Sequence, residues 1–146
     1  MAVITDSGGP GVLAADAAEA AGLELPVPAE PTRRRLADLL PAFAALANPI
    51  DLTPQCPPGN FVPAIEAIFE DPAFDGVIAI DCGLDAEGFG RGVAAAAART
   101  GKPAVAFVLD VPTVAGALTA GGVPTFPSPE AAVRGYLALV RRGEGR

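Results

Sequence analysis

Short apolar runs alternate with stretches of helical pattern along the whole chain of 146 residues. Runs of this length are typical of strands buried in a parallel sheet, and the helical stretches between them supply the crossover connections. The sequence therefore predicts a flavodoxin-like, doubly wound α/β fold of three layers, with five parallel strands in the order 2-1-3-4-5. The length suits one domain, to which we assign residues 1–146. The expected strands are Ala2–Thr5, Leu23–Leu25, Gly76–Ile80, Ala104–Val108 and Val123–Phe126.

Residues with known preferences for helix ends delimit the expected helices. Pro10 suits a first helical turn, and Gly22 suits a C-terminal cap. Thr32, Asn60 and Ser128 each precede a helical pattern and suit the N-cap position. The last four residues are expected to fray beyond the final helix. The expected helices are 10–21, 32–40, 61–71, 85–99, 111–121 and 129–142.

The composition excludes several kinds of chemistry. The chain has no histidine, which removes Ser-His-Asp catalysis, Cys-His catalysis and most zinc catalysis, so no catalytic residue is expected in it. Cys56 and Cys82 are too few for a disulfide framework or a cysteine zinc site, and no metal site is expected. The absence of tryptophan and the single tyrosine disfavour a flavin or base-stacking site.

The charge of the chain limits its partners. The net charge is −7 with a pI near 4.4, so no nucleic-acid partner is expected, and a bound phosphate would have to be held by backbone amides. No uninterrupted apolar stretch has transmembrane length, and no basic region precedes the first apolar run. We therefore expect no membrane association and a cytoplasmic location.

The stretch TDSGGPG, from Thr5 to Gly11, lies where the first strand should turn into the first helix. Glycine there allows a close approach to the backbone, and unpaired amides at a helix N-terminus attract anions. The phosphate-binding candidates are Ser7, Gly8, Gly9, Pro10, Gly11 and Val12. The alternative is a tight turn that needs glycine only for its geometry. The spacing matches neither the Walker A motif nor the full Rossmann fingerprint.

Asn48 and Asp51 belong to a proline-rich segment, Pro41–Gly59, that is expected to be irregular. Long loops in small domains are often functional, so both residues are candidates for a loop that reaches the site. The alternative, favoured by the chemistry of asparagine and aspartate, is an Asx-type turn that ends the second helix.

Two further groups of residues allow a functional and a structural interpretation. Asp81 and Cys82 should lie at the carboxyl edge of the sheet, where we favour a helix-capping role for Asp81 and a buried, unreactive thiol for Cys82 over catalytic roles. The arginines of the TRRR stretch, at positions 33–35, fit a solvated helix face better than a phosphate or partner contact.

Three stretches together resemble one protein family: VITDSGGPGVLAADAAEAAGLEL, LPAFAALANPIDLT and GKPAVAFVLDVPTVAGALTAGGVPTFPSPEAAVRGYLALV. They are similar to the flavodoxin-like ligase domain of NDP-forming acyl-CoA synthetases, within the succinyl-CoA synthetase superfamily. ADP-forming acetyl-CoA synthetases are its main members, and the resemblance covers nearly the whole chain.

The resemblance implies the reaction acyl-CoA + NDP + phosphate ⇌ acid + CoA + NTP, through an acyl phosphate and a phosphohistidine. It implies that the histidine lies in a CoA-binding ligase domain and the nucleotide site in an ATP-grasp domain, either in the same polypeptide or in separate subunits. The glycine stretch would then hold the phosphohistidine of the partner domain. CoA, ADP or ATP, phosphate and magnesium would serve the complete enzyme, with none of them bound by this chain alone.

The chain lacks the histidine, a CoA-binding Rossmann motif and an ATP-grasp segment, so we expect it to be inactive alone. The residues also allow two other functions. One is a non-catalytic regulatory module that binds a nucleotide phosphate or a small anion, and the other is an interaction domain.

Overall fold

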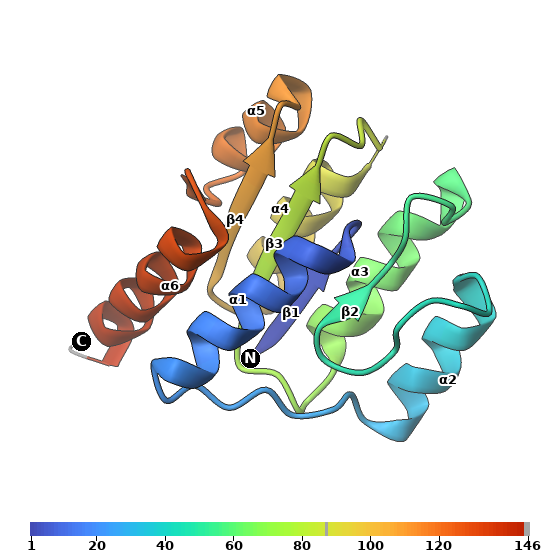
Figure 1. Ribbon diagram of the computed structural model, residues 1–146, viewed down its shortest axis with the longest axis horizontal. Helices are drawn as coiled ribbons and strands as arrows, with labels where there is room; N and C mark the ends of the chain where they lie inside the picture. The colour runs from blue at the N-terminus through green and yellow to red at the C-terminus, as the bar shows by residue number, and fades with distance from the viewer. Residues whose placement is uncertain (87, 145–146) are drawn as a thin grey trace.

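The computed structural model of the protein, which describes residues 1–86 and 88–144, has a five-stranded parallel sheet between two layers of helices (Figure 1). The strand order is β2-β1-β3-β4-β5, which confirms the predicted topology. The strands are β1 (Ala2–Thr5), β2 (Ile50–Asp51), β3 (Val77–Cys82), β4 (Ala104–Leu109) and β5 (Thr125–Phe126).

Helices α1 and α6 cover one face of the sheet, and α2 to α5 cover the other (Figure 1). The helices are α1 (Gly8–Ala20), α2 (Glu30–Leu39), α3 (Phe61–Glu70), α4 (Phe89–Thr100), α5 (Pro112–Ala120) and α6 (Pro129–Glu144), with a short 3₁₀ turn, η1, at Pro58–Asn60. Each expected helix is therefore present, with some of its ends displaced.

The predicted helix caps have mixed outcomes. Ser128 does cap α6, since its hydroxyl oxygen accepts a hydrogen bond from the Ala131 amide at 3.1 Å. Thr32 lies inside α2, because Glu30 and Pro31 already supply a favourable first turn, so its predicted capping role is wrong. Asn60 stands directly before α3, but its side-chain amide donates to the Leu39 carbonyl instead of capping the helix.

The start of α4 and the end of α6 are among the helix ends that differ from the sequence prediction. The α4 helix begins at Phe89 rather than at residue 85, after Gly88 with a φ of 90°; Glu87, within the expected helix, lies outside the described residues. The α6 helix continues to Glu144, so fraying directly after residue 142 is wrong, and residues 145–146 lie outside the described part of the chain.

The predicted second strand, Leu23–Leu25, is also wrong. This segment runs along the amino-terminal edge of the sheet on its way from α1 to α2 (Figure 1). The Glu24 carbonyl accepts a hydrogen bond from the N-terminal ammonium group of Met1 at 3.1 Å rather than from a neighbouring strand. Pro26 and Pro28 have no amide hydrogen, so this segment lacks backbone donors that a strand needs. The edge strand that pairs with β1 is instead β2, which comes from residues 41–59, the segment expected to be irregular.

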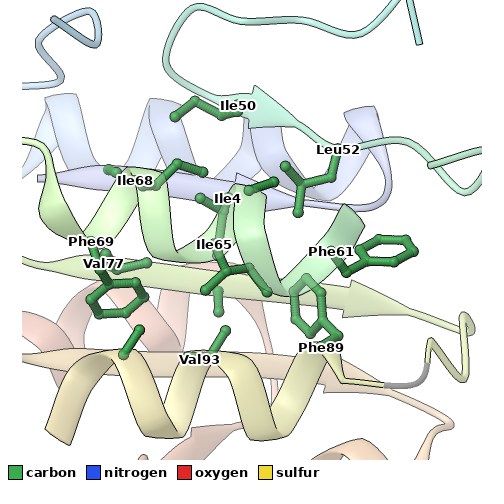
Figure 2. Close-up of a cluster of buried hydrophobic side chains, with 14 of the residues drawn as sticks. Ile4, Ile50, Leu52, Phe61, Ile65, Ile68, Phe69, Val77, Phe89 and Val93 are labelled. Carbon is green, nitrogen blue, oxygen red and sulfur yellow. The ribbon is translucent and has the colours of Figure 1, made fainter. Parts of the chain in front are cut away.

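The larger part of the core lies between the sheet and helices α2 to α5 (Figure 2). Phe61 and Phe89 pack edge to face there, with ring centroids 6.4 Å apart. Buried side chains from β1, β2 and α3, among them Ile4, Ile50 and Ile65, fill the same layer. This packing fixes the ends of the central strands, and with them the turns that leave the carboxyl edge of the sheet.

Candidate functional site at the carboxyl edge of the sheet

The turn between β1 and α1 is held by the side chain of Thr5. Its hydroxyl donates to the Ser7 carbonyl at 2.7 Å and accepts from the Ser7 amide at 2.9 Å. Gly11 packs directly on the same residue, since a Cβ atom on Gly11 would lie 2.8 Å from the Thr5 Cγ2 methyl group. The first turn of α1 is thus pressed onto the end of β1, and Gly11 is required for that close approach.

The first two residues of α1, Gly8 and Gly9, present exposed backbone amides. Neither amide has a hydrogen-bond partner in the described residues. Ser7 occupies the N-cap position without a side-chain cap, and no acidic residue lies in the first turn. A Cβ atom on Gly9 would meet nothing within 4 Å. The helix N-terminus thus offers two free donors with open space beside Gly9, an arrangement that suits an anion.

The other residues of the predicted cradle have different environments. Pro10 has no amide hydrogen to donate. The Gly11 amide donates to the Ser7 carbonyl at 3.4 Å, and Val12 lies in the second turn, where its amide has a partner in the helix. Ser7 uses its own amide in the turn with Thr5. The amides of Gly8 and Gly9 are therefore the ones available to a ligand.

Asn48 lies away from this site and completes the sheet. Its side-chain oxygen accepts from the Val3 amide at 2.9 Å, and its Nδ2 donates to the Met1 carbonyl at 2.8 Å. Since Ile4 pairs with Ile50, a strand residue at position 48 would pair with Ala2 and make these same two bonds with its backbone. The amide of Asn48 thus extends the β1–β2 pairing, and the predicted Asx turn at the end of α2 is wrong for this residue.

Asp51, by contrast, lies at the carboxyl end of β2 beside the candidate site. Its Oδ1 accepts from the Thr53 amide at 2.9 Å, which makes the Asx-type turn here rather than at Asn48. Its Oδ2 would lie 3.4 Å from a Cβ atom on Gly8. The structure therefore places Asp51 beside Gly8, and it leaves Asn48 at the opposite end of β2.

The carboxyl edge was expected to hold Asp6 and Asp81, but sequence reasoning did not predict that they form a buried pair. Asp81 belongs to β3 and cannot cap α4, which begins eight residues later, so that prediction is wrong. Its side chain is 0% exposed, and burial together with the charges of Asp6 and Asp85 raises its pKa to about 7. Asp6 is 2% exposed, and burial likewise raises its pKa. The register of a parallel sheet was the signal that could have paired them.

The other candidates agree with their structural interpretations. Cys82 packs against the core layer under α1 and α6, and burial raises the pKa of its thiol to about 11, so it is not an activated nucleophile. The arginines at positions 33 to 35 form exposed ion pairs: Arg33 and Arg34 with Glu30, and Arg35 with Glu70. These arginines belong to a solvated helix face.

Other features of the described residues set the context of the site. No three histidine, cysteine, aspartate or glutamate side chains in residues 1–86 and 88–144 come together in a way that could hold a metal ion. Across the same residues, no helix is both long enough and apolar enough to span a membrane.

The fold and the glycine turn define an α/β domain of flavodoxin type with an open helix N-terminus at the switch between β1 and β3. The model of the Ligase-CoA domain family matches residues 1–83. The chain belongs to this family, as the sequence resemblance led us to expect.

Named relatives are ADP-forming acetate–CoA ligases. The chain is 30% identical to subunit alpha of acetate–CoA ligase [ADP-forming] II from Pyrococcus furiosus, over 99% of this chain and 34% of that subunit. It is 33% identical to acetate–CoA ligase [ADP-forming] I from Archaeoglobus fulgidus, over 97% of this chain and 21% of that protein. The chain therefore spans between about a fifth and about a third of the length of these relatives.

Solved structures agree with this assignment. A Pyrococcus horikoshii protein superimposes with a TM-score of 0.86 at 29% identity, over 99% of this chain and 35% of its own. The dinucleotide forming acetyl-coenzyme A synthetase 1 of Ca. Korarchaeum cryptofilum, in complex with phosphate and ADP, gives a TM-score of 0.80 at 28% identity, over 95% of this chain and 32% of its own. In these proteins, as in the sequence relatives, the matching domain is one part of a larger chain.

Proposed function

We propose that this domain is a component of an NDP-forming acyl-CoA synthetase and that the N-terminus of α1 holds the phosphohistidine of a partner domain during phosphoryl transfer. The observation that carries the proposal is the pair of exposed, unpaired amides at Gly8 and Gly9. A transferring phosphoryl group is stabilised mainly by fixed donors that surround its oxygens, and a helix N-terminus supplies these without a competing nucleophile.

The surface behind the two glycines suits contact with another protein domain. Val12 and Leu13 follow Gly8 and Gly9 by four residues, so they lie on the same exposed side of α1. Their side chains are 53% and 50% exposed, so this side of α1 presents two adjacent apolar side chains to a partner. Apolar contact there would exclude water from the phosphoryl group and strengthen its interaction with the amides.

The remaining chemistry belongs to partners in this proposal. A CoA-binding domain that bears the histidine and an ATP-grasp domain would supply the sites for CoA, ADP or ATP, phosphate and magnesium. The chain itself has no histidine to carry the phosphoryl group, so alone it would form no phosphohistidine. Its part in the reaction is to position and stabilise a group that is covalently attached to another domain.

The proposal is tested by reconstitution. The purified chain alone should form no ATP from acetyl-CoA, ADP and phosphate, and no acid-labile histidyl phosphate. Addition of CoA-binding and ATP-grasp domains from the same organism should restore ATP formation, and their activity without this chain should be at least tenfold lower. Full activity of those domains without the chain would contradict the proposal. Anion binding by the chain with no effect on turnover would point to the regulatory module instead.

A further inference from the structure

Four buried side-chain oxygens of the described residues have no hydrogen-bond partner: Oδ2 of Asp6, both carboxyl oxygens of Asp81, and Oγ1 of Thr53. All four follow or end neighbouring strands, namely β1, β3 and β2, at the same edge of the sheet. A buried carboxylate without a partner is costly unless it binds a proton or another ligand. The unpaired carboxylate oxygens of Asp6 and Asp81 at this edge therefore indicate that a proton or another ligand binds there.

Asp6 and Asp81 lie side by side. Thr5 pairs with Ile80 in the parallel register, so the next residues, Asp6 and Asp81, are neighbours on adjacent strand ends. The Asp6 amide donates to the Ile80 carbonyl at 3.3 Å, and the Asp6 Oδ1 accepts from the Cys82 amide at 3.0 Å. Neighbouring parallel strands lie about 4.8 Å apart, so two ionised carboxylates at these positions would repel strongly in a buried environment.

The charged groups that act on the pair are all negative. Asp6 and Asp85 raise the pKa of Asp81, and Asp51, from β2, raises that of Asp6. The nearby Leu84 amide lowers the pKa of Asp81, but by less than burial and Asp6 raise it, and neither carboxyl oxygen has a hydrogen bond of good geometry. Cys82, the thiol next to Asp81, stays neutral because its own pKa is raised to about 11. A shared proton is the simplest way to neutralise one of the two carboxylates.

A metal ion fits the pair less well than a proton. Calcium and magnesium in proteins take six or more oxygen ligands, and zinc takes four ligands that usually include histidine or cysteine. Within the described part of the chain, no third carboxylate, thiol or imidazole joins Asp6 and Asp81 in a metal-binding group. The two acids are nearly inaccessible to solvent, and a proton is the ligand that needs least space.

The pair is close to the candidate anion site through Asp6, which only Ser7 separates from Gly8 along the chain. An ionised Asp81 would add a second buried negative charge near the two free amides and oppose the binding of an anion there. A proton on the pair removes that charge. By linkage, an anion that binds better to the protonated form must itself increase the proton affinity of the pair.

We propose that Asp6 and Asp81 share a proton and that anion binding at Gly8 and Gly9 is coupled to proton uptake by this pair. The proton comes from solvent, adds to one carboxylate oxygen and leaves again when the anion departs. No other bond forms or breaks. The inference rests on the proposed anion-binding role of the two glycines. It makes the site tightest when the pair is protonated and progressively weaker as the pair ionises.

Sulfate is the appropriate probe, because it does not change its own charge between pH 5.5 and pH 8.5. We expect its affinity for the wild-type chain to fall about fivefold or more over this range, the lower end of usual coupling factors. Calorimetry at pH 7 in two buffers with different ionisation enthalpies should show a net uptake of protons on binding. Asp81→Asn should abolish that uptake and flatten the pH dependence.

Matched variants keep the test decisive. Asp110→Asn removes an exposed carboxylate after β4 at a position with φ of 57°, which asparagine tolerates, and it should keep the wild-type pH dependence. Asp6→Asn retains a side-chain oxygen that can accept from the Cys82 amide. This variant replaces Asp81→Asn in the test if Asp81→Asn does not fold. In the wild type, the ¹³C resonance of the Asp81 carboxyl group should titrate near pH 7 and shift to higher pH with sulfate.

The outcomes separate this inference from the proposed function. Sulfate binding that is sensitive to Gly9→Val but independent of pH overturns the coupling and leaves the anion site in place. A wild-type chain that binds no sulfate at any pH overturns the anion site and the coupling together. Proton uptake that persists unchanged in Asp81→Asn and in Asp6→Asn overturns the assignment of the proton to this pair.

Discussion

The side-chain oxygen of Asn48 accepts a hydrogen bond from the backbone amide of Val3 at 2.9 Å, in the place where a strand backbone would otherwise stand. The same side chain donates to the Met1 carbonyl at 2.8 Å, so one amide group replaces one peptide unit of the missing strand. The short strand β2 is thereby anchored along the whole length of β1, and Asp51 is held beside the first turn of α1.

Asn48→Ala should therefore destabilise the protein. It leaves the Val3 amide and the Met1 carbonyl, both buried, without partners, at a cost of about 1–3 kcal/mol for each such group. We expect a loss of about 2 kcal/mol or more in the free energy of unfolding, measured by urea denaturation. Gln55→Ala removes an exposed amide from the loop after β2 and should change the stability by less than about 0.5 kcal/mol. Equal effects of the two substitutions would show that the Asn48 bonds are not needed.

Gly11→Ala should also destabilise the protein, because the added methyl group would lie 2.8 Å from the Thr5 Cγ2 atom. Overpacking of this kind costs roughly 1–3 kcal/mol. Thr5→Ser keeps the hydroxyl that binds both the amide and the carbonyl of Ser7 but removes the methyl group. The double variant Gly11→Ala/Thr5→Ser should thus be more stable than the sum of the two single effects predicts. A double-mutant cycle measured by thermal unfolding tests this. Strict additivity would contradict the proposed contact.

Gly9→Val should weaken anion binding at least tenfold while the fold survives, because a Cβ atom at this position meets open space. The complete loss of one oxyanion-type donor would cost roughly 2.7–4 kcal/mol, so a tenfold loss, about 1.4 kcal/mol, is the lower limit. Sulfate or phosphate titration of the chain measures the loss of anion affinity, and turnover of the reconstituted enzyme measures the effect on the reaction. Arg34→Ala, on the exposed face of α2, should change neither quantity. If Gly9→Val folds and leaves anion binding unchanged while Arg34→Ala abolishes it, the glycine turn has no anion-binding role.

Leu13→Asn should reduce turnover of the reconstituted enzyme through weaker docking while leaving sulfate affinity within about twofold, since the side chain lies one turn behind the free amides. The expected signature is a higher concentration of partner domains needed for half-maximal activity. Val27→Asn changes a residue that is 60% exposed at the other end of the sheet and should have no such effect. A Leu13 variant with wild-type dependence on partner concentration would exclude this surface from the interface.

Asp51→Asn should strengthen sulfate binding, because it removes a negative charge beside Gly8. Asparagine can still accept from the Thr53 amide through its side-chain oxygen, so the turn after β2 should persist. We expect an affinity gain of about threefold or more at low ionic strength, reduced by added sodium chloride. Unchanged or weaker sulfate binding would place the anion away from Gly8.

The stability of the fold should depend on Asp81 in a defined pH window. Its pKa rises from an unfolded value of 3.8 to about 7 in the folded state, so between these values the native state binds more protons than the unfolded state. This group therefore makes the protein less stable as pH rises from about 4 to 7, with no further loss above that range. Urea denaturation should show Asp81→Asn gaining stability over the wild type as pH rises. A constant difference from pH 4 to pH 8 would contradict the assignment.

Local patterns predicted most of the fold and one part of the site. The apolar runs at Ala2–Thr5 and Ala104–Leu109 are strands, and the glycine turn does leave the sheet into α1 with free amides. These features depend on residues adjacent in sequence, and their signals are therefore present in any short window. The role of those amides toward a phosphohistidine stays a prediction, as does the assignment of all 146 residues to one domain.

The second strand shows where local patterns fail. Leu23–Leu25 has the stronger local signal, yet the two residues Ile50 and Asp51 pair with β1, because Asn48 and the register of Ile4 supply the bonds that hold them there. A sequence window contains no information on which of two short segments will find a partner strand.

By itself, the sequence determined the parallel α/β class, the position of the glycine turn and the absence of a histidine nucleophile, because composition and short-range periodicity fix these properties. Only the tertiary structure decided that Asp6 lies beside Asp81 and that Asp51 lies beside Gly8. Both relationships join residues far apart in the chain through strand register. Register is set by packing over the whole sheet, and the burial and mutual repulsion that raise the pKa of Asp81 to about 7 exist only once that packing is complete.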